Sequence, residues 1–135
     1  GRLLLMRSTT LETVREVNLE RVASQRLLVS ADRLFVEIDD DQVQVFELND
    51  SFASAGTFHK NGARLIDAPL PLSSGGFLAA FSDGTIHRLG PLGLPAGESI
   101  QLGQQLRLGP IAIGDDFVVL ASDGSLYVLN DLVRD

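Results

Sequence analysis

The sequence predicts an all-β protein, a segment of a β-propeller with about three four-stranded antiparallel blades in an incomplete ring. Two observations lead to this fold class. The apolar residues fall in short runs broken by polar turns, in a chain of 135 residues with 13 Gly and 5 Pro. One pattern of runs and turns also recurs at the equivalent positions 1, 41, 84 and 124. A period of about 40 residues, made of short strands and tight turns, is typical of propeller blades.

The most regular part of each repeat is a pair of apolar runs. The first run has about five residues, the usual length of a strand, and lies between two polar turns. It is found within 31–41, 74–84 and 114–124. The second run follows directly, at 42–46, 85–89 and 125–129, and residues 1–6 fit the same slot. We expect the aromatic residues of the first runs in the core, namely Phe35, Phe77, Phe81 and Phe117.

Two of the turns between these runs carry an Asp-Gly pair. They are Ser82-Asp83-Gly84-Thr85 and Ser122-Asp123-Gly124-Ser125. Asp tolerates the left-handed region of backbone space, and Gly enters it without steric cost. We therefore predict hairpins with type I′ turns at both places.

Two further strands complete each repeat. Short apolar stretches at 26–29, 69–72 and 110–113 predict the innermost strand. The outer strands are expected within 10–19, 52–59 and 98–102, where weak patterning suits half-solvated strands. Residues 11–22 also fit the apolar spacing of a helix, but the repeat favours an outer strand plus a connection.

The repeat divides the chain into half a blade and three fuller blades. We expect the second half of a blade at 1–25, blades at 26–63 and 64–104, and a blade lacking most of its outer strand at 105–135. Propellers need about 4–8 blades to close a ring. We therefore expect either a piece of a larger protein or a chain that completes its ring with other copies. An open array would leave blade faces bare, so partner chains or further blades are expected.

Residues 109–130, GPIAIGDDFVVLASDGSLYVLN, resemble the quinoprotein-type (PQQ-like) β-propeller repeat. That family includes quinone-dependent dehydrogenases and non-catalytic propellers such as the lipoprotein that assists outer-membrane barrel assembly. Its repeat usually carries a Trp that docks on the neighbouring blade. This chain has no Trp and has Leu65 and Leu106 at matching positions. The resemblance therefore implies the non-catalytic branch, and it favours the bacterial cell envelope or periplasm.

The composition excludes several classes of function. There are 11 Lys and Arg against 18 Asp and Glu, which gives a formal net charge of −7 at pH 7. This balance argues against binding to nucleic acid or to anionic membranes. The absence of Cys excludes disulfides, thiolate zinc sites, iron–sulfur clusters and a Cys nucleophile. No apolar run is long enough to span a membrane, and the opening run is too short for a signal peptide.

The reactive side chains show no catalytic pattern. His59 precedes a turn and His87 lies in a predicted strand, without the spacing of metal ligands. Asp39–Asp41 and Asp115–Asp116 fall in turns and lack the alternating spacing of a calcium loop. The Gly-rich segment 90–97 lacks the Lys-Ser/Thr end of a phosphate loop and is expected to connect strands on a blade rim. We therefore predict no catalytic, cofactor-binding or metal-binding residue and no cofactor.

The leading hypothesis is a non-catalytic propeller module that serves as a scaffold for protein–protein interactions. It follows from a clear blade repeat without a reactive cluster. Two alternatives stay open: a fragment of a quinone-dependent dehydrogenase, or a propeller that binds a ligand or glycan. A single Tyr and no Trp disfavour stacking against sugars. The expected partners are proteins, or further blades or copies of the chain, with no nucleic acid and no membrane span.

Overall fold

The computed structural model describes residues 1–19, 23–39 and 41–130, with only the backbone described for 23–25. None of the described residues lies in a helix. Thirteen strands follow one another along them: β1 (Arg2–Met6), β2 (Thr13–Asn18), β3 (Ala23–Ser30), β4 (Arg33–Ile38), β5 (Gln42–Glu47), β6 (Ser54–His59), β7 (Leu70–Pro71), β8 (Phe77–Ala80), β9 (Thr85–Leu89), β10 (Pro95–Gln101), β11 (Leu106–Ile113), β12 (Asp116–Ala121) and β13 (Leu126–Leu129).

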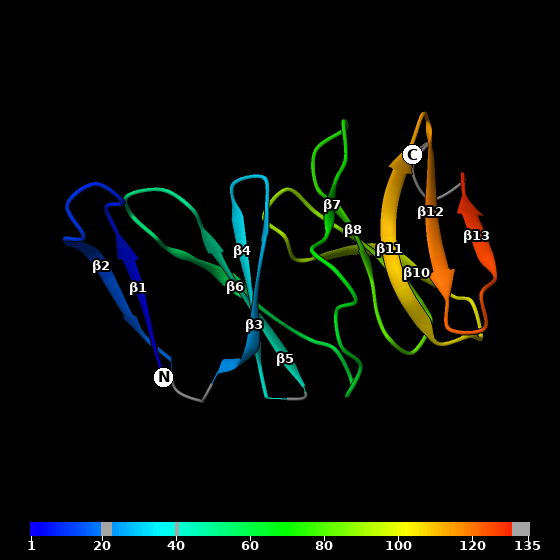
Figure 1. Cartoon of the computed structure of the whole chain (residues 1–135), viewed down its shortest axis with the longest axis horizontal. Helices are drawn as coiled ribbons and strands as arrows, with labels where there is room; N and C mark the ends of the chain where they lie inside the picture. The colour runs from blue at the N-terminus through cyan, green and yellow to red at the C-terminus, as the bar shows by residue number, and fades with distance from the viewer. Residues whose placement is uncertain (20–22, 40, 131–135) are drawn as a thin grey trace.

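These strands form four antiparallel sheets in chain order. The first sheet is β1–β2, the second β3–β6, the third β7–β10 and the fourth β11–β13. The sheets succeed one another along the long axis of the molecule, from the N-terminus at one end to β13 at the other (Figure 1). Among the described strands the first sheet does not pair with the last, so the array is open. The fold is the all-β propeller segment that the repeat predicts.

Residues 11–22, whose sequence fits either a helix or an outer strand, contain strand β2 within their described part. Thr13–Asn18 pairs with β1 in a ladder that runs from Met6↔Thr13 to Arg2↔Asn18. Three of its six residues, Thr13, Val14 and Val17, are β-branched, which favours the extended backbone. The strand therefore forms where the repeat, rather than the helical spacing, places it.

The core lies between the sheets, in three apolar clusters. Alternate residues of one strand face opposite neighbours, because the side chains of a strand point to its two faces in turn. In β4, Leu34 and Val36 pack toward the first sheet, whereas Phe35 packs toward the third. Phe35 meets Phe77 edge to face, with ring centroids 5.5 Å apart. Burial of one such side chain stabilises the fold by about 1.5–3 kcal/mol, so the inter-sheet clusters hold the array together.

The recurrent residues of the repeat occupy these clusters. Phe35, Phe77 and Phe81 are buried, and Phe117 is half-buried against the cluster between the third and fourth sheets. Leu65 and Leu106, which stand where the resembling repeat has Trp, are buried between neighbouring sheets. A leucine therefore fills each of these junctions.

The prediction of type I′ turns at the two Asp-Gly pairs was wrong. A type I′ turn needs positive φ at both central residues. Here Gly84 and Gly124 have φ of +95° and +91°, but neither preceding Asp has a positive φ. The N–H of Gly84 donates to the carbonyl of Phe81, 3.1 Å away, so the loop has three residues. The Asp83 carboxylate accepts the N–H of Thr85 at 3.0 Å, which holds this wider turn.

Residues 90–94 of the Gly-rich segment connect β9 to β10, as expected, and residues 95–97 begin β10. The centre of the segment packs against the second sheet. Gly93, with φ of +85°, comes so close that an added Cβ would lie 2.9 Å from Cγ1 of Val45. Leu94 packs on the apolar cluster between the second and third sheets. The segment is thus a docking element between blades.

Candidate functional site

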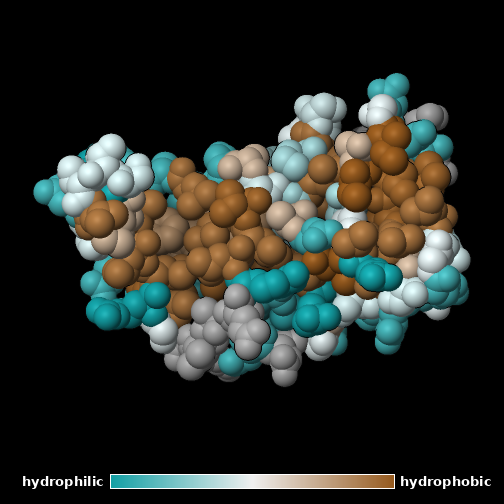
Figure 2. Space-filling view, viewed as in Figure 1, coloured by the Kyte–Doolittle hydropathy of each residue, from teal (hydrophilic) through white to brown (hydrophobic). Residues whose placement is uncertain are grey.

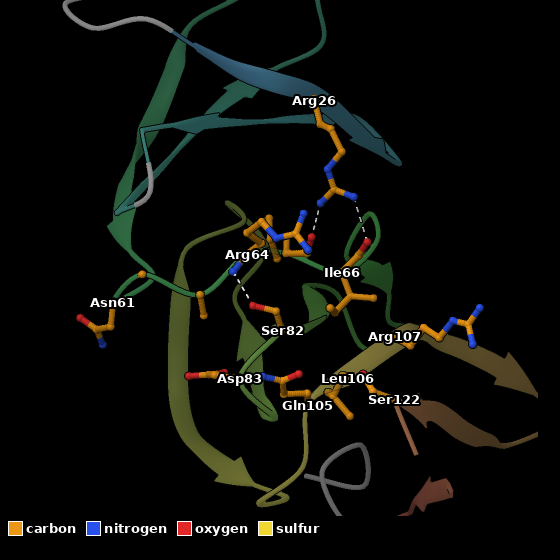
Figure 3. Close-up of a pocket in the computed structure, with 13 residues that line it drawn as sticks. Arg26, Asn61, Arg64, Ile66, Ser82, Asp83, Gln105, Leu106, Arg107 and Ser122 are labelled. Atoms are coloured by element: carbon orange, nitrogen blue, oxygen red, sulfur yellow. Dashed lines mark hydrogen bonds between the residues drawn. The ribbon is translucent and has the colours of Figure 1, made fainter. Parts of the chain in front are cut away.

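A pocket of about 720 Å³ opens where the second, third and fourth sheets meet. One wall is the connection 61–66 between β6 and β7. The other walls are the β8–β9 turn at Ser82 and Asp83, the segment 105–107 that begins β11, and Ser122 (Figure 3). The lining therefore comes from the strand connections at one end of the blades, where propeller loops are free to carry side chains that the core does not use.

Backbone hydrogen bonds fix the frame of this pocket. The N–H of Ser82 donates to the carbonyl of Arg64 at 2.8 Å, and the N–H of Ser122 donates to the carbonyl of Gln105 at the same distance. The N–H of Leu106 donates to the carbonyl of Ser82 at 3.2 Å. The buried side chains of Leu65 and Leu106 anchor the same segments. The walls are therefore held by main chain and core.

Three arginines line the pocket: Arg26, Arg64 and Arg107. Arg26, on β3, donates to the carbonyl of Ile66 at 3.0 Å and also to the carbonyl of Leu65 (Figure 3). Arg64 and Arg107 are exposed, and within the described part of the chain their guanidinium groups have no hydrogen-bond or ion-pair partner. Their donors are free to meet an external acceptor.

The charge of the pocket is opposite to that of the whole chain. Its lining holds three cationic side chains and one acidic side chain, Asp83. The complete chain carries a formal net charge of −7. Arginine suits planar anions, because its guanidinium presents several N–H donors in a fixed plane. The arrangement can therefore attract a carboxylate-bearing ligand.

A buried charge network supports the pocket from behind. Glu37, the last residue but one of β4, accepts hydrogen bonds from Lys60 Nζ and, at 3.0 Å, from Arg26 Nη2. The side chains of Glu37 and Lys60 are almost fully buried, whereas Arg26 is partly exposed at the mouth of the network. Arg26 thereby links the second sheet to the connection that precedes β7.

Neither the network nor the pocket is among the sequence predictions, which name no site residue. The arginines carry no repeat signal, because in the register that matches Leu65 with Leu106, Arg64 aligns with Gln105 and Arg107 aligns with Ile66. The only sequence signal for the network is a single acidic residue, Glu37, inside an apolar run.

The two histidines lie together although they are far apart in the sequence. His59 ends β6, His87 lies in β9, and both line a second pocket of about 280 Å³. His59 Nδ1 lies 3.1 Å from the Asp41 carboxylate, an exposed pair. No three His, Asp or Glu side chains in the described ranges come together in a way that could hold a metal ion.

The described residues of the acidic runs lie in turns, except Asp116. Asp39 and Asp41 lie in the turn between β4 and β5, and Asp40 lies outside the described residues. Asp115 lies in the tight connection from β11 to β12, whereas Asp116 begins β12 and pairs with Ile113. No helix among the described residues is long and apolar enough to cross a membrane.

Comparisons with known proteins identify the fold. No family model matches the chain, and no curated protein matches it either. Among solved structures, the chain is similar to BamB from Moraxella catarrhalis, with a TM-score of 0.71 and 21% identity over 96% of this chain. It is also similar to BBS1N, in a crystal structure with ARL6DN, with a TM-score of 0.64 and 15% identity over 97% of this chain.

The chain is much shorter than these structural relatives. It spans 40% of the BamB chain and 44% of the BBS1N chain. At these identities the similarity shows the fold alone. The function therefore has to be inferred from the residues of this chain.

Proposed function

We propose that the chain is a non-catalytic β-propeller module that binds another protein through the arginine-lined pocket. The observation that carries the proposal is the pair of unpartnered guanidinium groups, Arg64 and Arg107, on a frame fixed by backbone hydrogen bonds. One of the structural relatives was crystallised with a protein partner, ARL6DN, which is consistent with an interaction role for propellers of this kind.

The proposed ligand is an acidic, extended segment of a partner protein. Strand connections make up most of the pocket lining, and seven of its 13 residues carry side-chain hydrogen-bond donors. In this proposal, separate carboxylates of one extended segment engage Arg64 and Arg107. Such charge-assisted hydrogen bonds are about twice as strong as neutral ones.

The test uses a fluorescein-labelled hexaglutamate peptide and fluorescence anisotropy. We expect the unmodified chain to bind it, with affinity that falls as salt rises, because salt screens exposed charges. The double variant Arg64→Glu/Arg107→Glu should lose binding by about 10-fold or more, equivalent to about 1.4 kcal/mol. The matched control is the double variant Arg7→Glu/Arg15→Glu, which changes the net charge equally at two exposed arginines outside this pocket. Equal binding by the double variant and the unmodified chain would contradict the proposal.

A bacterial, cell-envelope location and a relationship to the PQQ-like repeat are further parts of the proposal. They rest on the sequence resemblance and on the likeness to BamB from Moraxella catarrhalis. Oxidation of an alcohol or sugar by the chain, with a quinone and calcium supplied and a dye as electron acceptor, would contradict the non-catalytic part.

A further inference from the structure

The fourth sheet exposes an apolar face at the end of the array. Two cross-strand rows form this face: Leu108, Leu120 and Leu126, and Ile111, Val118 and Val128. Leu126 is 66% exposed and Val128 is 57% exposed. Figure 2 shows a broad hydrophobic area at the end of the molecule that carries β11–β13. A face of this kind on a soluble protein marks an interaction surface.

The same positions are covered in the preceding sheet. The repeat aligns Val118, Leu120 and Leu126 with Leu78, Ala80 and Ile86 of the third sheet. Those three residues are completely buried, because the fourth sheet packs on them through residues such as Val119 and Leu129. The exposed face of the fourth sheet is therefore one half of the interface that joins each sheet to the next.

The other half of this interface is exposed at the opposite end of the chain. In β1, Leu3 and Leu5 face the second sheet, whereas Leu4 and Met6 point to the other side and are 47% and 45% exposed. The repeat aligns Met6 with Leu89 and Leu129, which pack in the clusters shared with the preceding sheet. One chain thus carries both complementary halves, each without its partner among the described residues.

We infer that a second copy of this chain docks head to tail, with the first sheet of one copy on the fourth sheet of the other. The contact would repeat in trans the packing that joins neighbouring sheets within the chain. Because the two surfaces differ, the interface is heterologous, and addition can continue until the assembly closes or extends. This inference is independent of the arginine-lined pocket.

The test measures mass in solution by light scattering between about 1 and 100 μM, a range that detects micromolar association. The unmodified chain should pass from the mass of one chain to that of two or more as concentration rises. Val128→Lys, in the fourth sheet, and Met6→Lys, in the first, should each weaken association at least 10-fold. Leu92→Lys is the matched control, because Leu92 is 51% exposed in the β9–β10 connection, outside both faces.

Mixing the two variants distinguishes the proposed geometry from misfolding and from a symmetric dimer. Val128→Lys keeps an intact first sheet and Met6→Lys keeps an intact fourth sheet. An equimolar mixture should therefore reach the mass of two chains and no more. A symmetric dimer through two fourth sheets predicts instead that Met6→Lys alone associates normally. That result, or a single-chain mass for the unmodified protein at about 100 μM, would overturn the inference.

Discussion

Glu37 and Lys60 form an ion pair in a part of the second sheet where every other repeat has an apolar residue. Glu37 aligns with Ala80 and Leu120. A charge at this position loses its hydration, so it is compatible with the fold only when other charges satisfy it. Lys60 and Arg26 supply those charges from the chain that follows β6 and from β3. The buried Glu37 charge is therefore compatible with the fold only while Lys60 and Arg26 are both present.

Removal of one member of this pair should destabilise the fold strongly. We expect Lys60→Met to lower the free energy of unfolding by about 3–5 kcal/mol, because Glu37 is left buried with less compensation. The double variant Glu37→Leu/Lys60→Met should recover most of that loss, since no buried charge is left. Urea denaturation measures both values.

The control for this prediction is an exposed ion pair of the first sheet. Arg2 and Glu16 lie 3.2 Å apart and are largely solvated. Arg2→Ala should change the free energy of unfolding by about 1 kcal/mol or less. A loss from Lys60→Met no larger than that from Arg2→Ala would show that the buried pair is dispensable.

The Asp123 carboxylate has a lowered pKa because it accepts the backbone N–H of Ser125 at 2.9 Å. A carboxyl group whose pKa is lower in the folded state stabilises the fold above its unfolded pKa of about 3.9. That contribution is lost as pH falls through the lower, folded pKa. We expect an NMR titration to place the midpoint of the Asp123 carboxyl below about pH 3.9. In Ser125→Pro, which lacks the backbone N–H, the pKa of Asp123 should return to its ordinary value.

At the scale of strands and turns, the repeat predicts most of the structure. The two runs of each repeat become strands because apolar residues are needed on both faces of a sheet that lies between two others. The turn type was not predictable from Asp-Gly alone. It depends on where the Asp carboxylate finds an N–H, and here that is two residues onward, at Thr85 and Ser125.

The same two turns allow a matched test of close packing. Gly84 and Gly124 occupy equivalent positions with nearly equal φ, so an alanine is equally strained in both. Among the described residues, the added Cβ would meet a neighbour only at Gly84, at 2.4 Å from the carbonyl oxygen of Gln104. We expect Gly84→Ala to reduce the free energy of unfolding by about 1–3 kcal/mol more than Gly124→Ala. Thermal or urea unfolding measures both values. If the two variants lose equal free energy of unfolding, backbone strain alone accounts for the loss and the prediction is wrong.

At the scale of the whole molecule, each sheet packs on the sheets beside it. Within the described part of the chain, the second and third sheets are covered on both faces, whereas the first and fourth are covered on one. The pocket could not be predicted from the sequence, because its walls come from three sheets and its three arginines do not occupy equivalent positions of the repeat.

This arrangement predicts a gradient of local stability. We expect backbone amides in β4, β5, β8 and β9 to exchange hydrogen most slowly, and those in β13 and β1 fastest. Hydrogen exchange followed by mass spectrometry measures the order. In dilute solution, uniform protection along the chain would contradict it, because solvated faces open more readily than covered ones.

The backbone bonds along the pocket have an evolutionary consequence. The turn at Ser82 is joined through its N–H to the connection before it, and through its carbonyl to the connection after it. Neither bond involves the side chains of Arg64 or Arg107. Those side chains can therefore be exchanged without disturbing the wall that carries them. Recognition at this surface is free to change from one descendant to another while the architecture beneath it is inherited intact.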